Sequence, residues 1–462
     1  THVHETGYYQ KAVARLDSLL AAQSNTTGSY FKAGWAKSNM TPSYPVPLSG
    51  YGDRKGALSI GVHDSVWVRG FVFDNGVNKT ALITLDALLV PPSVTYELKK
   101  RLPEIDFSPE NVFLSATHTH CSYGAWADSW IGNQFAGEFD QQVVDDISDA
   151  IISTIQKALY NVDHAKLGFS KYDAGELIHN RLVGEKGIID PWFRLIKIQK
   201  ESGEIGLITT FAAHATCLSG SEMRFSRDYP GTLVDSLETL PNVEFSAYCA
   251  GGVGSHRPAS GGFGQFERMA WLASKLKSKI SSDYSLIPVY TELNMDAFQF
   301  DLPLREPHWR ISTNWRLRPW IFNLLNEPTP HYISILKIGN IVLGPGGLLG
   351  RVNNTSLFTS SVTLLTSPES KLGVWVDRSQ INGLLVGSGD DHPILILYSK
   401  DADIKVGDFV SSSPASSLLP PNIPIGIVQS IDKTLQSKKT AKILLLAKPN
   451  VIDWVQILRA NT

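Results

Sequence analysis

The sequence predicts an α/β domain, in which helices accompany mixed sheets, followed by a small all-β barrel or sandwich domain. Over about the first 340 residues, strand-like apolar stretches alternate with stretches of helical period, which is typical of mixed α/β layers. After that point, short strand-like stretches lie between turns rich in Gly, Pro, Ser and Asp. A chain of 462 residues also exceeds one ordinary hydrophobic core, so we expect two domains.

The elements of the first domain follow from residue type and period. Stretches rich in Val, Ile, Phe and Thr predict strands at residues 67–75, 80–88, 111–117, 193–199, 205–213 and 244–252. The Ser-Gly-Glu sequence at residues 202–204 predicts a hairpin turn. Residues 138–160 predict a helix, because apolar side chains recur there every three or four positions, and residues 265–280 predict another.

The second domain contains strand signals and turn signals but no helical period. Strands are expected at residues 361–367, 393–399, 423–431 and 441–447. We therefore expect an N-terminal helical extension over residues 1–31, the α/β domain over residues 32–340 and the β-domain over residues 341–462.

Composition narrows the class of protein. A net charge of −2 gives no electrostatic reason to expect nucleic-acid binding, and no apolar run reaches the roughly 18–20 residues of a membrane span. Three cysteines are too few and too sparse for a disulfide framework. The chain begins with Thr1 rather than Met, which either the removal of a signal peptide or trimming of the chain would explain. We expect an exported protein, secreted or periplasmic, whose signal peptide has been removed.

Three histidines follow predicted strands. His118 and His120 close the strand at 111–117, and residues two apart in a strand face the same side, so both imidazoles can point into one cleft if the strand continues. His214 follows the strand at 205–213. Imidazole is a good zinc ligand, and α/β folds build sites at the carboxyl ends of strands. The alternative for each histidine is a hydrogen-bonded core residue.

Loops carry the other candidates. Arg181 offers a charged guanidinium for a carbonyl or carboxylate oxygen, or else forms a surface ion pair. Asp228 precedes a predicted helix, where a capping role is the alternative to a catalytic one. The Gly-rich turn at residues 249–258 either presents N–H groups to an oxyanion or is simply a tight turn. Asp86, in the strand predicted at 80–88, is a further candidate with a capping role as the alternative, and Glu222 is a candidate by its proximity to His214 in the sequence.

Together these motifs resemble the neutral ceramidase family over residues 32–343. The matching stretches occur in that family's order: SATHTH at 115–120, Asn-Arg at 180–181, FAAHAT at 211–216, DYPG at 228–231 and the Gly-rich turn at 249–258. Members of that family are zinc amidases that split the N-acyl bond of ceramide. The resemblance therefore implies an enzyme, with zinc as its cofactor and a ceramide-like lipid amide as its substrate.

The resemblance also implies roles for single residues. His118 and His214 would bind zinc, and His120 and Arg181 would contact the reacting groups. Zinc would activate a water toward the amide carbonyl, and a nearby His or Tyr would protonate the leaving amine. The family also takes Glu and Tyr ligands from further downstream. No Glu stands at residues 344–352, which read GPGGLLGRV, and no Tyr counterpart is found, so activity is expected to be impaired if nothing replaces them.

The tail resembles a different family, the β-domain of the rod-shape-determining protein MreC, over residues 339–458. The resemblance is carried by stretches that include GNIVLGPGGLLGRV at 339–352 and VIDWVQIL at 451–458. That family is a non-catalytic scaffold outside the cytoplasmic membrane. The resemblance implies self-association, or binding to cell-wall synthesis proteins, through residues 341–462. The two resemblances meet at residues 337–345, which indicates a fusion.

Three functions remain open at this point. The first is an exported zinc-dependent amide hydrolase, which rests on the ordered His, Arg and Asp motifs. The second is a non-catalytic cell-wall or cell-shape scaffold that acts through the tail, which rests on the missing Glu and Tyr ligands. The third is a chimera with no single evolved function.

Overall fold

The computed structural model describes residues 28–280 without a break and, with gaps, residues 6–14, 284–301, 315, 332–355, 360–397, 402–413, 423–432 and 439–447. The chain divides into two compact units. The first, called the α/β unit, comprises residues 27–291 and 296–336, and the second, called the barrel unit, comprises residues 1–26, 292–295 and 337–462. The expected helical extension at 1–31 lies largely outside the described residues, and the expected domain boundaries stay predictions.

An eight-stranded sheet is the frame of the α/β unit, in the order β11-β9-β8-β6-β1-β3-β4-β5. Its strands are β1 (Lys32–Asn39), β3 (Trp67–Asp74), β4 (Lys79–Leu85), β5 (Val112–Ala116), β6 (Asp163–Asp173), β8 (Trp192–Lys200), β9 (Ile205–Phe211) and β11 (Val243–Ala250). The pairs β4–β5 and β9–β11 are parallel, and the other neighbours are antiparallel. The predicted hairpin of β8 and β9 is confirmed.

The two halves of this sheet pack face to face. They are joined between β1 and β6, where Lys32 and Ala33 pair with residues 164 and 163. Trp35 of β1 stacks on Phe245 of β11 with ring centroids 6.5 Å apart. In addition, the hydroxyl of Thr84 in β4 donates to the backbone carbonyl of residue 248 in β11 at 2.7 Å. The fold therefore brings β4 and β5 close to β9 and β11, although they lie toward opposite ends of the strand order.

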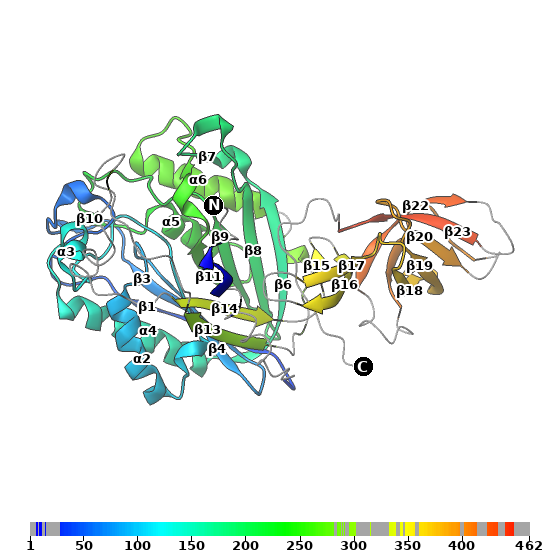
Figure 1. Cartoon of the computed structure of the whole chain (residues 1–462), viewed down its shortest axis with the longest axis horizontal. Coiled ribbons are helices and arrows are strands. Elements are labelled where there is room, and N and C mark those ends of the chain that lie inside the picture. The colour runs from blue at the N-terminus through cyan, green and yellow to red at the C-terminus, as the bar shows by residue number, and fades with distance from the viewer. Residues whose placement is uncertain are drawn as a thin grey trace. The chain divides into compact units, whose positions relative to one another are not determined.

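Helices cover the outer face of each half (Figure 1). α2 (Pro92–Arg101) and α4 (Gln141–Tyr160) pack on the half that contains β3, and α5 (Asp228–Leu237) and α6 (Gln265–Ile280) pack on the half that contains β11. The Asp140 side chain caps α4 by accepting from the Gln142 N–H. A further short helix, α3 (Trp130–Ala136), follows the histidine motif. The helices predicted at 138–160 and 265–280 are confirmed.

Short strands complete the α/β unit. β2 (Gly61–Val62) pairs with β10 (Arg224–Phe225), and β7 (Ile178–Asn180) pairs with β12 (His256–Pro258). A separate two-stranded sheet is formed by β13 (Met295–Asp301) and β14 (Tyr332–Ile338). Among the described residues, we find no helix with the length and apolar character that a membrane crossing requires.

The barrel unit contains a closed six-stranded antiparallel barrel. Its strands are β18 (Lys371–Val376), β19 (Ile381–Val386), β20 (Ile394–Leu397), β21 (Phe409–Ser412), β22 (Pro424–Asp432) and β23 (Lys439–Leu445). Alternate residues, such as Val374 and Val376, point inward and are fully buried. A three-stranded sheet precedes the barrel, formed by β15 (Val342–Gly344), β16 (Gly347–Thr355) and β17 (Ser360–Leu364). An α/β part followed by a small β-barrel is the predicted fold class, which is confirmed.

Candidate metal centre

His118 lies in a turn beyond the end of β5. That strand stops at Ala116, and His118 has a φ of 65°, in the left-handed region that residues other than Gly rarely adopt. The backbone N–H of His118 donates to the Ala87 carbonyl at 3.0 Å, and the ring Nδ1 lies 2.6 Å from the Leu88 carbonyl oxygen. The premise of a strand continuing through His118 and His120 is therefore wrong, and a turn brings the two rings together instead.

His214 reaches the same point from the end of β9. Its Nε2 lies 3.1 Å from the Nε2 of His118 and 2.8 Å from the Nε2 of His120. The possible ligand atoms of the three side chains all lie within 4.8 Å of one another. Among the described residues, this is the one group of three or more His, Cys, Asp or Glu side chains with metal-binding proximity. We call it the histidine cluster.

His120 is held tightly against a neighbouring loop. The Tyr51 ring lies 4.8 Å from the His120 ring, centroid to centroid. Gly50 has a φ of 104°, and a Cβ at this position would come within 2.6 Å of the imidazole, so both its conformation and its lack of a side chain are required. His120 is 9% exposed, and its Nδ1 has no hydrogen-bond partner among the described residues.

Burial lowers the pKa of all three imidazoles, because it disfavours their charged form. The pKa of His120 falls to about 3, helped by the neighbouring His214, and the pKa of His214 falls to about 4. The charge of Arg181 adds to the lowering of the pKa of both His118 and His214, which places Arg181 within electrostatic reach of the cluster. At neutral pH the cluster consists of uncharged imidazoles, the form in which histidine binds metals.

Arg181 and His214 are anchored by the same Gly-rich turn. The Nε of Arg181 donates to the Gly254 carbonyl at 2.9 Å, and its backbone N–H donates to the Ser255 carbonyl at 2.9 Å. The Nδ1 of His214 lies 3.0 Å from the Val253 carbonyl oxygen. The Gly-rich turn thus uses its carbonyl oxygens to orient two candidate site residues.

Arg54 is a structural residue of the site that sequence reasoning missed. It is 7% exposed, and its guanidinium donates to the backbone carbonyls of Ser49, His120, Gly220 and Glu222. These acceptors come from three separate segments, so one side chain fixes the backbone of His120 against two loops. No local sequence signal marks Arg54, because two of its partners lie 166 and 168 positions away.

Asp228 stabilises the loop that follows His214 through hydrogen bonds to its backbone. Its carboxylate accepts from the N–H of Cys217 at 3.3 Å, of Leu218 at 3.1 Å and of Tyr229 at 2.6 Å. Asp228 is 1% exposed and has a φ of 54°. Its oxygens are therefore committed to backbone groups, which favours the structural alternative for this residue.

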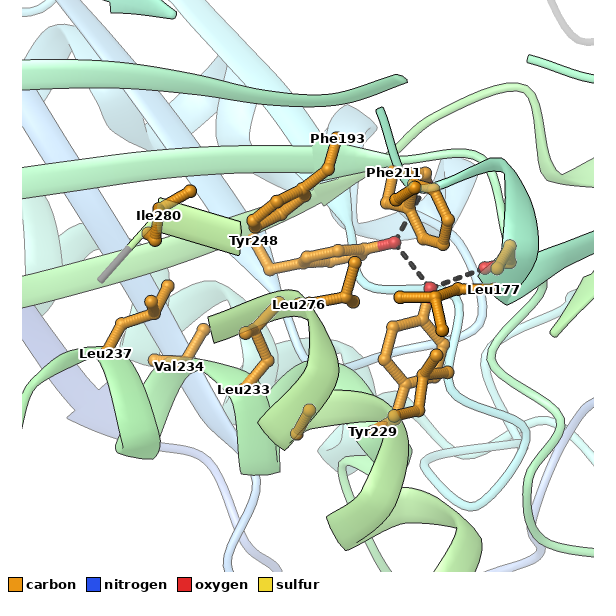
Figure 2. Packing of buried hydrophobic residues seen from close by; sticks show 14 of the residues in the cluster. Leu177, Phe193, Phe211, Tyr229, Leu233, Val234, Leu237, Tyr248, Leu276 and Ile280 are labelled. Atoms are coloured by element: carbon orange, nitrogen blue, oxygen red, sulfur yellow. Dashed lines mark hydrogen bonds between the residues drawn. The ribbon is translucent and has the colours of Figure 1, made fainter. Parts of the chain in front are cut away.

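Two buried tyrosines form hydrogen bonds to the backbone at the end of β9 and just beyond it, directly before His214 (Figure 2). The Tyr229 hydroxyl donates to the Ala213 carbonyl at 2.6 Å, and the Tyr248 hydroxyl donates to the Phe211 carbonyl at 2.8 Å. The two hydroxyl oxygens lie 2.7 Å apart. This network fixes the backbone from which His214 projects.

The remaining candidates are not part of the cluster. Asp86 is 3% exposed, and its carboxylate accepts from the Trp67 N–H at 2.9 Å, which ties β3 to the turn that carries the Ala87 and Leu88 carbonyls. Glu222 forms a two-point ion pair with Arg224, at 2.7 and 2.8 Å. Neither residue belongs to the group of possible metal ligands.

Comparisons with known proteins match two separate parts of the chain to two different family models. Residues 31–248 match the family model of the N-terminal part of neutral/alkaline non-lysosomal ceramidases, and residues 334–459 match that of the barrel core of the rod-shape-determining protein MreC. The ceramidase match ends earlier than the expected residue 343.

Individual relatives agree with the two family models. The neutral ceramidase of Pseudomonas aeruginosa is 24% identical over 219 residues, which are 44% of this chain and 32% of that protein. The cell shape-determining protein MreC of Caulobacter vibrioides is 34% identical over 124 residues, which are 27% of this chain and 34% of that protein. The chain thus spans about a third of the length of these relatives.

A solved structure supports the fold of the first part. The crystal structure of the Pseudomonas aeruginosa neutral ceramidase superposes with a TM-score of 0.55 at 17% identity, over 68% of this chain and 62% of that one. At this identity the likeness concerns the fold alone. The chain therefore joins a segment similar to the N-terminal part of neutral ceramidases to a segment similar to the barrel core of MreC.

Proposed function

We propose that the chain is an exported, zinc-dependent amide hydrolase that acts on ceramide-like lipid amides. The observation that carries the proposal is the convergence of the imidazoles of His118, His120 and His214, within a segment similar to neutral ceramidases. Neutral nitrogen donors suit zinc, and catalytic zinc sites keep one position open for water or substrate.

His118 and His214 would hold the metal. In each, a backbone carbonyl faces Nδ1, from Leu88 and Val253 respectively, so that Nδ1 carries the proton and Nε2 is left as the donor atom. Zinc, when bound, supplies a Lewis acid that polarises the amide carbonyl and makes water a better nucleophile. The two carbonyls fix both rings in the orientation that this chemistry requires.

Arg181 and His120 would act on the substrate. Arg181 is anchored through its Nε to Gly254, and its guanidinium is suited to bind the carbonyl oxygen as negative charge develops there. His120 is the remaining imidazole of the cluster. It is uncharged at neutral pH, so it would take a proton from the attacking water and pass it to the leaving amine.

Hydrolysis of an N-acylsphingosine by the full chain tests this function. We expect turnover with added zinc and a loss of roughly 100-fold or more in His118→Ala. His164→Ala is the matched control, because His164 is exposed and does not belong to the cluster. No turnover by the zinc-loaded wild-type chain would reject the proposed activity.

A second candidate function rests on the barrel. Residues 334–459 match the barrel core of MreC, and the six strands from β18 to β23 close into a ring. We propose for this part self-association, or binding to cell-wall synthesis proteins. In a pull-down with such proteins, the full chain should bind and a chain that ends at residue 340 should not. Equal binding by both chains would show that the barrel does not mediate this binding and would reject the proposal.

A further inference from the structure

We infer that His120 is a third metal ligand, so that His118, His120 and His214 form a three-histidine site with one position left for water or substrate. The inference builds on the metal of the proposed function and changes the role of one residue. It rests on distances, on the ring atoms that the carbonyls leave available, and on the donors present in the chain.

The distances leave no room for a substrate between His120 and His214. Zinc bound by imidazoles at about 2.0–2.1 Å with tetrahedral angles has its nitrogens about 3.3 Å apart. The Nε2 of His214 lies 2.8 Å from that of His120 and 3.1 Å from that of His118. Shifts of a few tenths of an ångström would bring both of these pairs to that spacing, and the possible ligand atoms of all three side chains lie within 4.8 Å of one another. An atom of a lipid amide does not fit into the 2.8 Å between His120 and His214.

The assigned protons point to a cation at the centre of the cluster. Carbonyl oxygens face the Nδ1 atoms of His118 and His214, so both Nε2 atoms present lone pairs to each other at 3.1 Å. Two lone pairs at this distance repel unless a positive charge lies between them. The Nδ1 of His120 has no hydrogen-bond partner among the described residues, and its Nε2 faces that of His214 at 2.8 Å. Its Nε2 is thus available as the third donor.

The donors found in the part of the chain that the structure describes also favour three histidines. Residues 344–352 contain no Glu, and the group of possible ligands found among the described residues contains no carboxylate. Two histidines alone make a weak zinc site, whereas three protein ligands and an open position are the pattern of catalytic zinc. His120 supplies the third ligand without any residue of the barrel unit.

X-ray absorption of the zinc-loaded full chain, combined with zinc competition against a chromophoric chelator, tests the inference. We expect scattering from three imidazoles, and a zinc dissociation constant that rises by more than about 100-fold in His120→Ala, beyond the loss typical of an outer-shell partner. His164→Ala should bind zinc like the wild-type chain. The imidazole count comes from the wild-type chain, so it holds even if His120→Ala does not fold.

The outcomes separate this inference from the proposed function. Two imidazoles in the wild-type chain, together with unchanged affinity in His120→Ala and lost affinity in His118→Ala, would overturn the role of His120 and leave the proposed function standing. A wild-type chain that binds no zinc would overturn both.

Discussion

Replacing Asp86 by Asn should remove a pH-dependent cost of burying a carboxylate. Asp86 is 3% exposed, and burial raises its pKa from 3.8 to about 6, although the charges of Arg227 and Arg69 and the Trp67 N–H oppose the rise. An Asn side chain does not ionise, and its carbonyl oxygen can keep the hydrogen bond to the Trp67 N–H. The substitution therefore tests the ionisation alone.

The magnitude follows from the two pKa values. Because the folded pKa lies above the unfolded one, Asp86 contributes its full stability below about pH 3.8 and loses that contribution as the pH rises through about 6. The interval between 3.8 and about 6, at about 1.4 kcal/mol per pH unit, corresponds to about 3 kcal/mol. From pH 4 to pH 7, Asp86→Asn should gain up to this amount in free energy of unfolding relative to the wild-type chain.

Urea unfolding followed by tryptophan fluorescence, at pH 4, 5, 6 and 7, measures this difference. Transitions of the two units should be fitted separately, because a chain of two units need not unfold in one step. The barrel unit is the same in both chains and provides an internal reference. A difference between variant and wild-type that stays constant within about 0.5 kcal/mol from pH 4 to pH 7 would refute the reasoning.

Three further substitutions test the construction of the site. His118→Gly should be more stable than His118→Ala by about 1 kcal/mol in urea unfolding, because Gly adopts the φ of 65° without strain; equal stabilities would contradict this. Tyr248→Phe should lower the free energy of unfolding by about 1–3 kcal/mol, because it leaves the Phe211 carbonyl without its hydroxyl donor; an unchanged unfolding midpoint would show that this hydrogen bond does not stabilise the fold. Gly50→Ala should weaken zinc binding by at least about 10-fold, because its Cβ displaces the His120 ring; wild-type affinity would show that the ring does not matter for the metal.

Elements with strong local patterns were predictable from the sequence. The helix expected at 138–160 is α4 at Gln141–Tyr160, and the strand expected at 205–213 is β9 at Ile205–Phe211. In α4 the apolar period marks the buried side of the helix, and in β9 a nearly continuous run of buried residues marks a strand that is covered on both faces. The strand expected at 361–367 is β17, but it lies in the three-stranded sheet before the barrel, because partner choice is set by distant segments.

The geometry of the site was less predictable. The order of the motifs in the sequence predicted one site that contains His118, His120 and His214, and the structure places their rings together. Strand alternation was the wrong reason, because His118 adopts a left-handed turn that the Ala-Thr-His sequence does not signal. The role of Arg54 could not be predicted from the sequence either, because the backbone carbonyls that accept from its guanidinium lie far away in the chain.

Zinc content is the most direct test of the histidine cluster as a metal centre. The full chain should be loaded with zinc, dialysed and measured by mass spectrometry of the metal, beside His214→Ala and the exposed-residue control His164→Ala, with circular dichroism to confirm folding. We predict about one zinc per chain in the wild type and the control, and almost none in folded His214→Ala. A wild-type chain without zinc, or a His214→Ala chain that keeps its full zinc content, would contradict the metal centre.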